Sequence, residues 1–81
     1  MATLTVNVEN EDGSPASGIK VTVFHSDGFL PQSYIEDYTD DDGVAELDVP
    51  NYCTADVHAD GAEQLSDIQI TGSDEDVTIS L

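Results

Sequence analysis

Apolar side chains recur at every second position along most of this chain, and this period constrains the fold more than any other feature. The segments 4–8, 45–49 and 53–59 each alternate apolar with small or polar residues. Successive side chains of a β-strand point to opposite faces of a sheet, so the period predicts strands with one apolar and one polar face. No ten-residue stretch has the 3.6-residue period of a helix, and residues 59–67 are the only candidate for a short helical turn.

Turn-forming residues divide the chain into seven expected strands, with turns every 8 to 12 residues or so, the spacing of a two-sheet sandwich. The expected strands cover residues 4–9, 19–24, 34–39, 45–49, 53–59, 65–70 or 68–70, and 77–81. A chain of 81 residues leaves too little material for a second core. We therefore expect one all-β domain over residues 1–81, a seven-stranded antiparallel Greek-key sandwich.

Three stretches resemble carboxypeptidase regulatory-like domains. Residues 12–21 resemble the family's D-G-x-P-x-x-G-x-x-V opening, and residues 39–45 resemble its T-D-x-x-G hairpin. Val49-Pro50 followed by an aromatic residue, and then residues 59–61, resemble a third stretch, although Cys53 stands where the family usually has tyrosine. The resemblance implies a transthyretin-like (prealbumin-like) sandwich and a non-catalytic accessory module. It brings no functional residue to this chain.

Acidic residues dominate the charge of the chain. Eighteen Asp and Glu face a single base, Lys20, for a net charge of −17, and the acids are spread over residues 9–76. Their repulsion acts over a Debye length of about 10 Å at 0.1 M salt but only about 3 Å at 1 M. We therefore expect a protein of an extreme halophile, such as a haloarchaeon, whose cytoplasm is molar in salt. The alternative is an ordinary acidic protein.

The same charge balance bears on the classes of partner. The chain has no cluster of Lys or Arg that could replace the counterions of phosphate groups. It also lacks the basic residues that attract a protein to anionic lipids. We therefore expect no binding to nucleic acid and none to membranes.

Features of compartment and redox chemistry are few. Residues 1–15 have neither a basic segment nor an apolar segment of the kind found in secretory signals. No apolar run approaches the roughly 20 residues of a membrane-spanning helix. Cys53 is the single cysteine, so no disulfide forms within the chain. We expect a cytoplasmic protein.

The residues able to do chemistry are scattered. His25, His58 and Cys53 lack the spacing of a local metal-binding pair, and the alternation turns His58 away from Cys53, so we expect two exposed histidines. A thiol on the core face is usually inert packing. No Gly-x-Ser-x-Gly elbow or phosphate-binding loop occurs. We therefore expect neither catalysis nor a cofactor.

Clusters of acids in two turns leave a second hypothesis open, a cation or small-ligand binder. Asp37 and residues 40–42 lie beside Gly43, and residues 74–76 form a second cluster. Calcium favours carboxylate ligands of this kind, but aligning Gly43 with the invariant glycine of an EF-hand puts Tyr38 at the first ligand position.

The segment after residue 23 carries more apolar surface than a small sandwich needs, and aromatic residues are enriched at protein contacts. The candidate partner-contact residues are Phe24, Phe29, Leu30, Tyr34 and Tyr38. In the alternative interpretation, the loop that holds Phe29 and Leu30 folds over one end of the sandwich and closes it. We expect a non-enzymatic interaction or structural accessory module that binds a protein partner or itself.

Overall fold

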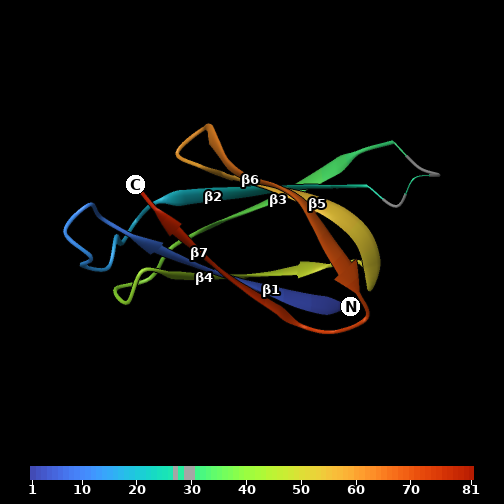
Figure 1. Ribbon diagram of the computed structural model, residues 1–81, viewed down its shortest axis with the longest axis horizontal. Helices are drawn as coiled ribbons and strands as arrows, with labels where there is room; N and C mark the ends of the chain where they lie inside the picture. The colour runs from blue at the N-terminus through green and yellow to red at the C-terminus, as the bar shows by residue number, and fades with distance from the viewer. Residues whose placement is uncertain (27, 29–30) are drawn as a thin grey trace.

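Two β-sheets enclose one apolar core in the computed structural model, which describes residues 1–26, 28 and 31–81 (Figure 1). The strands are β1 (Ala2–Glu9), β2 (Lys20–Ser26), β3 (Ser33–Tyr38), β4 (Val44–Val49), β5 (Tyr52–Ala59), β6 (Ala62–Thr71) and β7 (Glu75–Ser80). The described residues form no helix, so the all-β prediction is confirmed. None of them builds a helix that is long and apolar enough to cross a membrane.

Residues 59–67, the only candidate for a short helical turn, form none, because they end β5 and begin β6. Asp60 and Gly61 have φ angles of 52° and 85°, and Ala59 pairs with Ala62 across them. Two residues at positive φ make the tight turn whose twist suits a β-hairpin. The hairpin therefore closes at once, and β6 starts several residues earlier than expected.

The three-stranded sheet has the order β4-β1-β7, and the four-stranded sheet has the order β3-β2-β5-β6. All pairings are antiparallel except that of β1 with β7, which is parallel. The prediction of a wholly antiparallel sandwich is therefore wrong at this pair. A hairpin forces neighbouring strands to run in opposite directions, but the connection from β6 to β7 crosses between the sheets and imposes no such direction.

The core lies between the sheets and consists of the side chains that alternation turned inward. β1 shows this most clearly, since its even-numbered residues are buried and its odd-numbered residues are half-buried. Cys53 is buried among them, with 7% of its surface exposed, and its Sγ lies 3.5 Å from the carbonyl oxygen of Pro50. The core position predicted for Cys53 is confirmed.

One buried hydroxyl ties the loop before β2 to the turn after β3. Thr39 is 5% exposed, and its Oγ1 donates to the carbonyl of Ala16 at 2.6 Å. The same Oγ1 accepts from the backbone N–H of Ile19 at 2.9 Å. Both backbone groups depend on this side chain, because buried polar groups need a partner.

Thr39→Val should lower the free energy of unfolding by about 1–3 kcal/mol, since valine keeps the volume but leaves two backbone groups of Ala16 and Ile19 unpaired. Urea denaturation in concentrated KCl measures the change. Thr78→Val, the same substitution at an exposed position of β7, should change the free energy of unfolding by less than about 0.5 kcal/mol. Equal effects of the two substitutions would show that the Thr39 hydroxyl adds nothing.

Candidate functional site

Three aromatic rings form a row across the outer face of the four-stranded sheet. Phe24 of β2 lies opposite Tyr34 of β3 and opposite Asp56 of β5 in the strand register. The Phe24 and Tyr34 ring centroids are 5.7 Å apart, and the rings are tilted by 44°. His58, the diagonal neighbour of Phe24 on β5, packs edge-on against the Phe24 ring, with the two ring centroids 4.8 Å apart. We call Tyr34, Phe24 and His58 the aromatic row.

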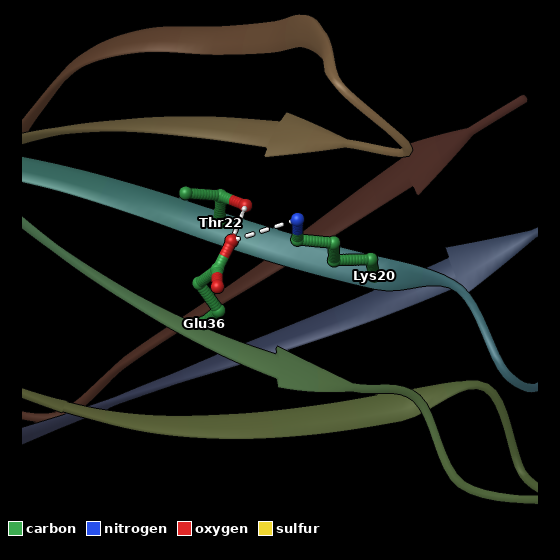
Figure 2. A network of polar contacts seen from close by, with 3 residues as sticks. All are labelled: Lys20, Thr22 and Glu36. Atoms are coloured by element: carbon green, nitrogen blue, oxygen red, sulfur yellow. Dashed lines mark hydrogen bonds and ion pairs between the residues drawn. The ribbon is translucent and has the colours of Figure 1, made fainter.

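A charged pair lies beside the aromatic row. Figure 2 shows Lys20 and Thr22 of β2 reaching the same oxygen of Glu36 on β3. Lys20 Nζ lies 3.0 Å from Glu36 Oε2, and the Thr22 hydroxyl donates to that oxygen at 3.2 Å. The hydrogen bond to Glu36, followed by the attraction of its charge, raises the pKa of Lys20 above its ordinary value. Lys20, the single Lys or Arg of the chain, is thus already paired with an acid on the same face.

Two hollows flank the rings of Phe24 and His58. The first has a volume of about 270 Å³ and is lined by Lys20, Thr22, Phe24, Tyr34, Glu36, His58 and Gly61. The second has a volume of about 300 Å³ and is lined by Phe24, Gln32, Asp56, His58 and Glu63. Because both hollows include the same two rings, Phe24 and His58 form the wall between them. Nδ1 of His58 is buried and has no hydrogen-bond partner among the described residues.

The structure brings together two of the five predicted contact residues, Phe24 and Tyr34. Tyr38 lies on the same face but at the other end of β3, opposite Lys20. Phe29 and Leu30 lie outside the described residues. The alternative interpretation, in which their loop closes one end of the sandwich, therefore stays a prediction. A role for these residues in binding a partner stays a prediction.

Sequence patterns alone did not join His58, Lys20 and Glu36 in one site. Alternation does turn all three outward, and that signal was present in the sequence. The sequence does not reveal the strand register, which places Thr22 opposite both Glu36 and His58. These pairings join segments that lie far apart in the chain. The prediction of two exposed histidines is wrong, since both are half-buried, His58 by its contact with Phe24.

One acid of each turn cluster accepts hydrogen bonds from backbone N–H groups. Asp40 Oδ1 accepts from the backbone N–H groups of Asp42 at 2.9 Å and Val44 at 3.0 Å, which closes the turn before β4. Asp74 Oδ1 accepts from the backbone N–H of Thr3 at 2.9 Å. Within residues 1–26, 28 and 31–81, no three His, Cys, Asp or Glu side chains are placed to hold one metal ion. The carboxylates of Asp40 and Asp74 have a structural task that needs no cation.

The outer face of the four-stranded sheet therefore combines exposed aromatic surface, carboxylates and two hollows. Tyr34 and Tyr38 are 60% and 61% exposed, so two large aromatic side chains on one face leave apolar surface to the solvent. Such surfaces are typical of contacts with other molecules. No family model matches this chain and no curated protein matches it, so a role for the face rests on these features of its own.

Proposed function

We propose that this protein is a non-enzymatic interaction module that binds a protein partner, or a second copy of itself, through the outer face of its four-stranded sheet. The observation that carries the proposal is the exposure of Tyr34 and Tyr38 on the face that holds the aromatic row. Tyrosine offers a large, rigid contact area with a polar tip, and it is enriched among residues that dominate binding energy.

Cys53 and His58 are not placed to act as a nucleophile and its base. Cys53 faces the core from β5, whereas His58 lies on the opposite face of the same strand. A nucleophile and its base need to be within hydrogen-bond reach, and the two faces of a strand prevent this. His58 instead packs against Phe24.

We also propose that the sandwich is a transthyretin-like Greek-key domain of the carboxypeptidase regulatory-like kind. The chain passes from β1 to β2 and β3 of the other sheet, returns for β4, and crosses twice more for β5, β6 and β7. Repeated crossing between sheets is typical of Greek-key sandwiches. The resemblance at residues 12–21 and 39–45 supports the same assignment, because both stretches form turns between strands.

A halophilic, cytoplasmic setting completes the proposal. The net charge of −17 is carried by acids that are exposed or half-buried throughout the described residues. A surface of this kind suits a solvent that screens charge over a few ångströms. Binding is then governed by short-range contacts such as those of the aromatic row.

Replacing both Tyr34 and Tyr38 by serine should weaken the complex with a native partner, or self-association, by about tenfold or more, since loss of one central aromatic contact often costs over about 1.4 kcal/mol. Sedimentation in concentrated KCl measures self-association, and size-exclusion chromatography of the host extract with mass spectrometry detects a partner.

Tyr52→Ser is the matched control on the same sheet, because Tyr52 is 70% exposed but lies beyond the end of the pairing of β5 with β2, about 13 Å along the strand from Asp56, the partner of Phe24. The proposal requires the control to associate like the natural chain. It fails if the double variant associates normally or if Tyr52→Ser has the same effect.

A further inference from the structure

We infer that the second hollow, beside Phe24 and His58, receives an arginine side chain from a basic segment of a protein partner. The inference rests on the proposed function and names the chemistry of the partner. It follows from three observations: the rings that wall the hollow, the carboxylates that line it and the charge of the whole chain.

The two rings offer a surface for a flat cation. Phe24 and His58 meet edge-on with an interplanar angle of 70°, so the pair presents differently oriented ring surfaces to the hollow. A guanidinium group is planar and stacks on aromatic faces, and the attraction grows when water is excluded. The volume of about 300 Å³ gives a side chain room to enter.

The hollow also supplies acceptors for the five N–H donors of a guanidinium. Asp56 and Glu63 contribute carboxylates, and Gln32 contributes an amide oxygen. Asp56 is held in place, because its Oδ1 accepts from the backbone N–H of Asp67 at 3.0 Å. Carboxylate pairs with arginine are stronger than neutral hydrogen bonds.

The charge of the chain selects a basic partner over a second copy. Another copy would bring a net charge of −17 against the same charge, and the single base that it carries is bound by Glu36. A basic segment instead brings an opposite charge into direct contact with the carboxylates that line the hollow. Arginine fits better than lysine in concentrated salt, because its guanidinium sheds water more readily than an ammonium and keeps its short-range contacts.

The test uses a synthetic peptide in which arginine alternates with threonine, with citrulline and lysine versions as comparisons. Citrulline has nearly the shape of arginine but no charge. At about 1 M KCl, where the Debye length is about 3 Å, the arginine peptide should bind about tenfold more tightly than the citrulline peptide, and also more tightly than the lysine peptide. The amide NMR shifts that it causes should centre on Phe24, Asp56, His58 and Glu63.

Asp56→Asn combined with Glu63→Gln should weaken binding of the arginine peptide by about tenfold. The fold should survive, since an asparagine amide keeps an oxygen that can accept from the N–H of Asp67. Glu46→Gln is the control, because Glu46 is an exposed acid of β4 in the other sheet. Equal binding of the citrulline peptide, NMR shifts centred on the acidic turns, or an equal effect of the control would overturn the inference.

The two proposals fail separately. If the tyrosine variants abolish the native complex while the arginine peptide does not bind, the inference falls and the interaction module stands. If the arginine peptide binds the hollow while the tyrosine variants form the native complex normally, the contact face proposed for the module is wrong and the arginine site stands.

Discussion

Removing salt should unfold this protein. The far-UV circular dichroism signal of a β-sandwich should be strong in about 1 M KCl and mostly lost at about 0.01 M, where the Debye length rises from about 3 Å to about 30 Å. The radius of gyration is 12.0 Å, so at low salt the repulsion between carboxylates of the −17 chain reaches across most of the molecule. At high salt each carboxylate interacts only with its nearest neighbours.

The folded state has little with which to oppose this repulsion. A domain of this size buries only about 60% of the surface that its unfolded chain exposes, and its total stability is on the order of 5 kcal/mol. The ion pair of Lys20 with Glu36 is the one salt bridge in the described part of the chain, and both side chains are partly exposed. An exposed pair of this kind contributes little to stability, because water and salt screen it.

Acids of neighbouring strands show where the repulsion acts. Thr5 of β1 has Glu46 of β4 on one side and Asp76 of β7 on the other. Two spacings between strands separate these carboxylates, about 10 Å, which is within the Debye length at low salt but beyond it at 1 M. Glu46→Lys should therefore move the folding midpoint to a lower salt concentration, as a titration of the dichroism signal with KCl would measure.

Two comparisons separate screening from other effects of salt. NaCl should restore the signal at the same ionic strength as KCl, whereas sucrose, which favours compact states without screening charge, should restore little of it. A chain whose dichroism is the same in desalted water and in concentrated KCl would contradict both this prediction and the halophilic setting.

The inward and outward faces of the strands could be predicted from the sequence, because they depend on a local period. Val21 and Val23 are fully buried, as alternation required, and Phe24 lies outside with Tyr34. The early start of β6 follows from local chemistry as well, since Asp60 and Gly61 form a two-residue turn.

The candidate site could be predicted only in part, because it depends on which strands are neighbours. His58 meets Phe24 through the pairing of β5 with β2, and no local pattern contains that pairing. The parallel direction of β7 beside β1 has the same origin, since it is set by a connection between sheets. Register and strand order come from the packing of the whole core.

Gly43→Ala should remove most of the free energy of unfolding of the protein. Gly43 is buried in the turn before β4, and a Cβ atom there would lie 2.5 Å from the carbonyl oxygen of Val8 and 3.0 Å from the backbone nitrogen of Ala16. Its φ of 75° adds a cost of about 1–2 kcal/mol for any residue with a side chain.

The clash is severe because the neighbouring atoms are backbone atoms already held by hydrogen bonds. The N–H of Val8 donates to the carbonyl of Gly43 at 2.7 Å, and the N–H of Ala16 donates to the carbonyl of Val8 at 2.9 Å. Making room for a methyl group means lengthening both bonds, at about 1 kcal/mol each, and separating the turn from β1. Together with the strain at φ, the loss is about 3–4 kcal/mol, which is most of the stability of a small domain.

Gly18→Ala separates the clash from the strain. Gly18 has a φ of 70°, close to that of Gly43, but no atom lies within 4 Å of the Cβ that alanine would add. Its substitution should therefore cost only the conformational strain, about 1–2 kcal/mol, and leave a folded protein in concentrated KCl. Urea denaturation monitored by circular dichroism compares the two variants at one salt concentration. Similar losses for both would mean that the close approach of Val8 to Gly43 adds nothing beyond the left-handed backbone.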